Sequence, residues 1–185
     1  MQHADHVALI RAGVEGAGQR WLELGAGDGE FTLALADVLG GAGDIVAVDL
    51  DRWALTELSA RVDDRFPDTT LETVIGDFSA GLPAGPFDGV LAANSLHFVE
   101  RVAPVLASIH GALRPGGRLV VVEYDADRGN PWVPHPISFR RLGGLVRGAG
   151  FDEPERLHSV PSRFLGSIYG AVAHRPGSRP PDPRT

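Results

Sequence analysis

Apolar segments of strand length alternate with amphipathic segments of helical period through most of the chain. The predicted strands are residues 20–24, 44–50, 71–78, 87–94 and 117–125, and the predicted helices are residues 4–13, 31–40, 52–65, 102–113 and 137–150. Strands that alternate with helices build a parallel sheet with helices on both faces. The pattern therefore predicts a doubly wound α/β fold.

The last third of the chain departs from this alternation. Residues 117–125 are nearly all β-branched or apolar before turning polar, which is typical of a central strand buried on both faces. After a loop at 126–136 and a helix come two strand candidates, 151–160 and 164–174, close enough in sequence to pair antiparallel. We expect one domain over 1–174 and a disordered tail over 175–185, which is rich in proline and polar residues.

The composition is that of an ordinary soluble protein and excludes several chemistries. The 185 residues are 43% hydrophobic, and no apolar run approaches the roughly 20 residues of a membrane span. The first residues do not resemble a secretion signal, so we expect a cytoplasmic protein without a membrane partner. The chain has no cysteine and no lysine, which excludes disulfides, thiolate metal sites and lysine catalysis, and we predict no metal site.

Charge is unevenly distributed along the chain. The net charge of −7 argues against a nucleic-acid partner, because phosphate binding relies on clustered positive charge. Residues 1–100 hold 5 arginines and 17 acids, whereas residues 101–185 hold 12 arginines and 7 acids. The two halves can face different ligands, or the difference can reflect chance and solvated surface.

Polar residues and glycines gather where the predicted strands end. Ligands of open α/β sheets bind beyond the carboxyl ends of the strands, so these residues are the candidate site. The strand ends carry Glu23 with Gly25, Gly27 and Gly29, then Asp49, then Asp77 with Phe78, then Asn94 to His97, and then Glu123 to Asp125.

The first of these strand ends is the glycine-rich turn GAGDGE, residues 25–30. Alternate glycines allow a tight turn and a close approach of a ligand to the backbone. The turn departs from the dinucleotide fingerprint GxGxxG, which has a glycine where this chain has Glu30. Asp49 ends the next strand, where a carboxylate can accept two hydrogen bonds from a ribose diol. The alternative is an ordinary turn followed by a helix-capping aspartate.

Residues 20–125 resemble the class I S-adenosylmethionine-dependent methyltransferases. The resemblance rests on LELGAGDGEF, VAVDLD, VIGDF, FDGVLAANSLHF and LRPGGRLVVVEYD. It implies a mostly parallel seven-stranded sheet of order 3-2-1-4-5-7-6 whose last strand is antiparallel. It also implies S-adenosylmethionine as the cofactor and S-adenosylhomocysteine as the product. The acidic first half suits such a cationic cofactor.

The resemblance also implies roles for individual residues. Gly25, Gly27 and Gly29 would line the methionine part of the cofactor, with Glu23 supporting its ammonium group. Asp49 would hold the ribose, and Leu50 would touch the adenine. Asp77 and Phe78 would flank the adenine ring, and Asn94 and Ser95 would begin the floor under the sulfonium.

The catalytic residues are less sharply indicated. Methyl transfer from a sulfonium is an in-line displacement that gains much of its rate from alignment, so a base is not obligatory. His97 is a candidate base because its ordinary pKa of about 6.5 suits proton transfer near neutrality, and Tyr124 is a second candidate. The alternatives are a histidine bonded to the backbone at a helix entry and a tyrosine at the edge of the core.

The acceptor side indicates a small-molecule substrate. AANSLHF stands where nucleic-acid amino methyltransferases carry an Asn/Asp-Pro-Pro-Tyr type motif, and no second domain is evident. We predict that Trp132, Phe139, Arg163 and Tyr169 line the acceptor pocket, although Trp132 and Phe139 can instead pack their loop onto the sheet. Arg163 is the first choice to anchor a carboxylate, phosphate or similarly electron-rich group beside Trp132.

Two other functions remain compatible with these motifs. A non-catalytic module that binds S-adenosylmethionine or S-adenosylhomocysteine would share the glycine turn and Asp49, and only turnover separates it from an enzyme. A nicotinamide-dependent oxidoreductase would share the fold but requires the third glycine at the position of Glu30. The oligomeric state is not indicated.

Deleting the residues after Arg175 tests the predicted tail. Its composition offers nothing to bury, so the truncated chain should keep its melting temperature and its affinity for S-adenosylhomocysteine. Differential scanning fluorimetry and calorimetry measure the two quantities. A drop of many degrees would mean that the tail docks on the domain.

Overall fold

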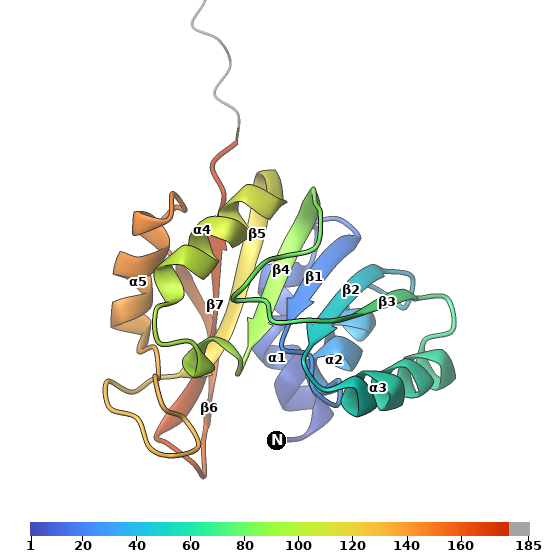
Figure 1. The fold of residues 1–185 in the computed structure, drawn as a ribbon, viewed down its shortest axis with the longest axis horizontal. Helices are drawn as coiled ribbons and strands as arrows, with labels where there is room; N and C mark the ends of the chain where they lie inside the picture. The colour runs from blue at the N-terminus through green and yellow to red at the C-terminus, as the bar shows by residue number, and fades with distance from the viewer. Residues whose placement is uncertain (178–185) are drawn as a thin grey trace, which may run out of the picture.

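A computed structural model describes residues 1–177 and contains one seven-stranded sheet (Figure 1). The strand order is β3-β2-β1-β4-β5-β7-β6, and β7 runs antiparallel to both of its neighbours. The predicted fold class and strand order are confirmed. The strands are β1 (Arg20–Leu24), β2 (Asp44–Asp49), β3 (Thr70–Ile75), β4 (Phe87–Ala93), β5 (Leu113–Tyr124), β6 (Glu155–Pro161) and β7 (Ser167–His174). The helices are α1 (His3–Val14), α2 (Glu30–Val38), α3 (Arg52–Arg65), η1 (Leu96–Phe98), α4 (Val102–Ala112) and α5 (Phe139–Gly148).

The strand β5 starts earlier than the sequence predicted. It begins at Leu113 and includes Arg-Pro-Gly-Gly, whose first three residues lie between the predicted helix 102–113 and the predicted strand 117–125. Its pairing with β4 shifts in register between Phe87 and Gly89, so the added segment is an irregular extension of the strand. The extension is held because the Gly116 N–H donates to the carbonyl of Arg175 at 3.0 Å.

The end of the described chain is bonded to this extension. The Arg175 N–H donates to the Gly117 carbonyl at 2.8 Å, and its guanidinium donates to the His110 carbonyl at 2.8 Å. Ordered structure therefore reaches Arg175, one residue into the predicted tail. Residues 178–185 lie outside the described residues.

Helices cover both faces of the sheet. In Figure 1, α4 and α5 lie in front of the sheet, and α1 and α2 lie behind it. Behind the sheet, Trp21 of β1 packs with Ile10 of α1 and Leu35 of α2. In front, Leu22 and other residues of β1 and β4 pack with α4 and α5. The neighbouring strands β1 and β4 are therefore followed by helices on opposite faces, which leaves a crevice at their carboxyl ends.

The N-terminus lies at the edge of the sheet where β1, β2 and β4 end (Figure 1). This position places the start of α1 beside the crevice. Within residues 1–177, no helix combines the length and the apolar character needed to cross a membrane.

Candidate active site

The turn between β1 and α2 uses its three glycines in three ways. All have positive φ: +73° at Gly25, +54° at Gly27 and +88° at Gly29. A Cβ at Gly25 would lie 2.6 Å from the Cβ of Ser95, and one at Gly29 would lie 2.2 Å from Leu58 Cδ1. A Cβ at Gly27 would meet no described atom within 4 Å. The lack of a side chain at Gly25 thus lets the loop after β4 pack against the turn, and the same lack at Gly29 lets α3 pack there. Gly27 has open space beside its backbone.

Asp49 at the end of β2 is held by the same turn. Its Oδ2 accepts from the Gly27 N–H at 2.8 Å, and its Oδ1 accepts from the Asp51 N–H at 2.9 Å. A carboxylate has about four acceptor positions, so the two oxygens keep lone pairs for a ligand. Asp49 is therefore oriented by two backbone donors and faces the crevice in a fixed direction.

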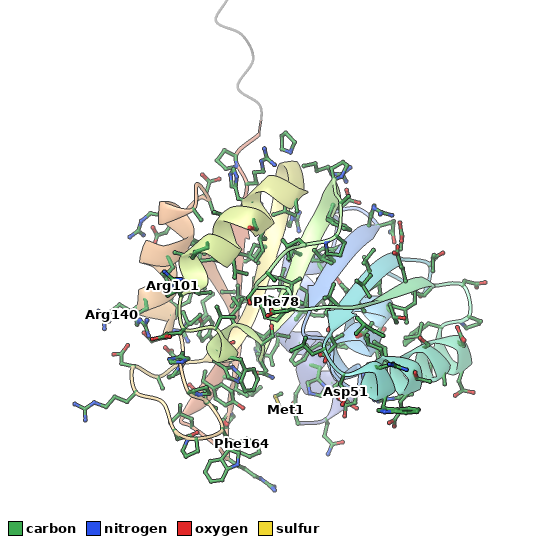
Figure 2. All side chains as sticks on the ribbon, viewed as in Figure 1. Met1, Asp51, Phe78, Arg101, Arg140 and Phe164 are labelled. Atoms are coloured by element: carbon green, nitrogen blue, oxygen red, sulfur yellow. The ribbon has the colours of Figure 1, made fainter. Side chains whose placement is uncertain are left out.

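A cavity of about 390 Å³, which we name the central cavity, occupies the crevice. It is lined by Gly25, Gly27, Asp49, Leu50, Gly76, Asp77, Phe78, Asn94, Ser95 and Phe98. Eight of these ten were predicted as cofactor residues, and Gly76 and Phe98 are additions. Figure 2 shows Phe78 near the middle of the ribbon, where the segment after β3 crosses in front of the sheet.

Both polar and apolar side chains line the central cavity. Hydrogen bonds from the side chain and backbone of Ser79 keep the pKa of the Asp77 carboxyl below its usual value. Leu50 and Phe98 are apolar yet more than half exposed. An exposed apolar pair at a cavity rim suits a planar apolar group such as a base.

The predicted cofactor residue Glu23 lines a second hollow of about 260 Å³, which we name the inner cavity. Glu23 is 1% exposed, and its Oε2 has no hydrogen-bond partner among residues 1–177. Burial raises the pKa of Glu23 to about 8; the nearby Thr32 hydroxyl opposes the shift, and the charge of Asp49 adds to it. Of the predicted cofactor residues, only Gly29 lines neither cavity, because it packs against Leu58.

Asn94 stands where the cavities meet. It has a φ of +51°, a conformation that asparagine tolerates better than most residues. Asn94 lines the central cavity, the inner cavity and a third hollow described next. In the described chain, Asn94 Oδ1 and the neighbouring Ser95 Oγ are buried without a hydrogen-bond partner.

The third hollow, which we name the outer cavity, has a volume of about 720 Å³. It is lined by Met1, Gln2, Asp5, Asn94, Tyr124, Val160, Pro161, Ser162, Arg163, Phe164 and Ile168. Met1 and Phe164 lie at the lower edge of the molecule in Figure 2. Burial, and then the charge of Glu123, raise the pKa of Tyr124, while the Ser162 side chain opposes them. Tyr124 therefore stays protonated at neutral pH and can donate a hydrogen bond.

His97 lies beside the cavities and lines none of the three. Its ring Nδ1 is 3.0 Å and 3.1 Å from the two oxygens of the buried Glu123 carboxylate, and its backbone N–H donates to the same carboxylate. The Tyr124 N–H also donates to Glu123. Glu123 thus ties the loop after β4 to the end of β5. The sequence indicated Glu123 only as part of a polar strand end and did not predict its hydrogen bonds to His97.

Three of the four residues predicted for the acceptor pocket lie outside the three cavities. Trp132 is 69% exposed and lines none of the three cavities. Tyr169 is fully buried, with its hydroxyl donating to the Ile137 carbonyl at 2.8 Å, and Phe139 packs edge-on against it. Alternate residues of β7 face opposite sides of the sheet, so Ile168 reaches the outer cavity and Tyr169 does not. Arg163 lines that cavity together with the aromatic residues Phe164 and Tyr124.

The arrangement suits a ligand that joins a cation, a diol and an apolar ring. The unpartnered oxygens of Glu23 and Asn94 can accept from an ammonium group, and Asp49 can accept from a ribose. The side chains at Leu50, Phe78 and Phe98 offer apolar surface for a base. The residues present therefore fit S-adenosylmethionine.

Comparison with known proteins agrees with this fit. The family model described as "Methyltransferase domain" matches residues 22–121. An uncharacterized methyltransferase of Mycobacterium tuberculosis (strain ATCC 25618 / H37Rv) is 28% identical over 178 residues, which cover 91% of this chain and 87% of that protein.

Another relative is far longer than this chain. The highly reducing polyketide synthase cm3B of the fungus Cordyceps militaris is 29% identical over 174 residues, which cover 86% of this chain and 6% of the synthase. Among solved structures, the 1,6-didemethyltoxoflavin-N1-methyltransferase of Burkholderia thailandensis superposes with a TM-score of 0.71 at 22% identity. That match covers 94% of this chain and 78% of the other, and its structure contains 1,6-didemethyltoxoflavin and S-adenosylhomocysteine.

Replacing Glu23 with Gln should change how stability depends on pH. Because the folded pKa of about 8 lies above the unfolded value of 4.5, the unfolded chain loses this proton first, and stability falls as pH rises from about 4.5 to 8. Glu23→Gln removes this loss. Urea unfolding should give similar stabilities for the two proteins near pH 5, and at pH 8 the variant should be more stable by roughly 2–4 kcal/mol.

The exposed Glu72→Gln on β3 is the matched control and should follow the wild type at every pH. Parallel curves for Glu23→Gln and the wild type would contradict a raised pKa at Glu23.

Proposed function

The chain belongs to the class I S-adenosylmethionine-dependent methyltransferase family, and from this premise we propose that it methylates a small molecule bound in the outer cavity. The observation that carries the proposal is Asn94, which lines both the cofactor-side cavities and the outer cavity. A methyl group can only be transferred where cofactor and acceptor meet. Asn94 marks that meeting point, and its Oδ1 is buried without a partner in the described chain.

The proposed cofactor residues divide by the part of the cofactor they hold. Glu23 and Asn94 accept from the ammonium group, and Asp49 accepts from the ribose hydroxyls. The adenine is contacted by Leu50, Phe78 and Phe98, with Asp77 beside it. Gly25 and Gly27 would let the cofactor approach the backbone, Gly29 packs the turn against α3, and Ser95 would form part of the floor under the sulfonium.

Alignment is the main contribution we assign to the protein. The bound cofactor supplies an electrophilic methyl group on a cationic sulfur. The outer cavity, which Asn94 lines, would hold the acceptor in reach of that methyl. Holding two reactants in an attack geometry can supply a large share of the rate enhancement.

For the acceptor we propose an electron-rich small molecule with an anionic or strongly polar group. Arg163 lines the outer cavity and forms no ion pair within residues 1–177, so its guanidinium can bind an oxyanion. Tyr124 donates a hydrogen bond, and Phe164 supplies an aromatic surface. The structural neighbour that holds 1,6-didemethyltoxoflavin supports a small-molecule acceptor.

We keep His97 as the candidate base for hydroxyl or amine acceptors. Glu123 holds its Nδ1, and its Nε2 has no hydrogen-bond partner in the described chain. The ring lines none of the three cavities, so a water molecule or a hydroxyl must relay the proton. Burial raises the pKa of Tyr124, which disfavours this second candidate as a base at neutral pH and favours the role of hydrogen-bond donor.

Asp49→Ala should weaken binding of S-adenosylhomocysteine by about 10- to 100-fold, the equivalent of losing charged hydrogen bonds worth about 1.5–3 kcal/mol. Asp49→Asn is the matched variant: it keeps one acceptor oxygen and should lose less. Calorimetry measures both affinities, and circular dichroism checks the fold. Unchanged affinity in a folded Asp49→Ala protein would show that Asp49 does not hold the ribose.

Turnover tests the proposed function. The purified chain should release S-adenosylhomocysteine when it is supplied with S-adenosylmethionine and an acceptor from a panel of acidic, neutral and basic small metabolites. We expect acidic acceptors to be preferred, and Arg163→Ala to lower kcat/KM for them by about 10-fold or more. Arg140→Ala, a largely exposed arginine paired with Asp127, is the control.

A preference for cationic acceptors that survives Arg163→Ala would contradict the acceptor assignment. Tight cofactor binding without methylation of any acceptor would favour a non-catalytic binding module.

A further inference from the structure

The α1 residue His6 lines the inner cavity. His6 is 5% exposed, and its ring lies against Phe31 with 4.7 Å between centroids. Its Nδ1 is buried without a hydrogen-bond partner among residues 1–177. The nearest carboxylate oxygen, of Glu30, is 3.7 Å away, and Glu30 is bonded to Arg61 at 2.7 Å.

Three unpartnered polar atoms surround the inner cavity, and each comes from a different element. They are His6 Nδ1 from α1, Glu23 Oε2 from β1 and Asn94 Oδ1 from the loop after β4. Leaving a buried polar atom unsatisfied destabilises a fold, and such atoms are rare in native proteins. Three around one hollow indicate a ligand that satisfies them together.

The three atoms differ in the charge they can bind. Glu23 and Asn94 present oxygens, which accept hydrogen bonds from an ammonium group. Burial lowers the pKa of His6 against the opposing charge of Glu30, so its ring is neutral in the free protein and carries one N–H donor. The first turn of α2, Glu30 and Phe31, also lines the cavity, and the start of a helix favours a negative group.

We propose that His6 binds the carboxylate of the cofactor's amino-acid end, opposite Glu23, so that the inner cavity recognises a zwitterionic α-amino acid group. The proposal rests on the proposed function, because it concerns the same cofactor. It assigns α1 a direct part in the site: the helix carries the group that reads the carboxylate, and its first residues border the outer cavity. His6 thereby makes cofactor binding selective for ligands that keep the whole amino-acid end.

Three ligands whose amino-acid ends differ test the proposal by calorimetry, and for each ligand the affinity of the variant is compared with that of the wild type. S-adenosylhomocysteine carries both ammonium and carboxylate, decarboxylated S-adenosylmethionine carries only the ammonium, and 5′-methylthioadenosine carries neither. His6→Phe keeps a ring against Phe31 and removes both nitrogens. It should weaken S-adenosylhomocysteine binding about 10-fold and leave the other two affinities within about 2-fold.

Two further variants separate binding from folding. His6→Asn places an N–H donor near the position of the imidazole Nδ1 and should restore most of the affinity for S-adenosylhomocysteine. His3→Phe changes the other histidine of α1, which is bonded to Asp37, and should change none of the three affinities.

Each other outcome overturns one proposal or the other. Equal weakening of all three ligands in His6→Phe, or full affinity for S-adenosylhomocysteine there, would overturn the role of His6. Failure of His6→Asn to bind better than His6→Phe would do the same. Absence of S-adenosylhomocysteine binding by the wild type would instead overturn the proposed function.

Discussion

The site depends on the junction of β1 and β4, two parallel neighbours whose following helices lie on opposite faces of the sheet. Because α2 turns to one side and η1 and α4 turn to the other, a gap opens at the carboxyl ends of these two strands. The glycine turn, Asp49 and Asn94 all face the gap that results. The cavities are therefore consequences of the strand order, and the side chains at the strand ends decide what they bind.

The free protein is destabilised at this gap. A carboxyl that is 1% exposed and has an unpartnered oxygen in the described chain lowers stability at neutral pH, which an apolar or amide side chain would avoid. The presence of a buried carboxyl at Glu23 is explained if a cationic ligand binds to it. The buried polar atoms of His6, Asn94 and Ser95 also have no hydrogen-bond partner in the described chain, and their presence is explained in the same way if a ligand binds to them. If S-adenosylmethionine satisfies these groups, as we propose, its binding restores the stability that the free protein lacks.

The sequence predicted the residues that line the central cavity better than those that line the outer cavity. Gly25, Asp49 and Asn94 sit at the ends of parallel strands, and the rule that such ends converge needs only the strand assignment. The acceptor side depends on loops and on the pleat of β7. One step along that strand separates Ile168, in the outer cavity, from Tyr169 in the core. The sequence did not predict the contacts of His6, because α1 and the start of α2 are distant in sequence and their packing against each other produces no local sequence motif.

We propose that the cofactor's ammonium group binds the buried carboxylate of Glu23. The titration of Glu23 by carbon-13 NMR of its side-chain carboxyl, in the free protein and with saturating S-adenosylhomocysteine, measures it most directly. We expect Glu23 to titrate near pH 8 in the free protein and to remain ionised well below that pH in the complex. An unchanged titration in the complex, or an ordinary acidic pKa in the free protein, would contradict it.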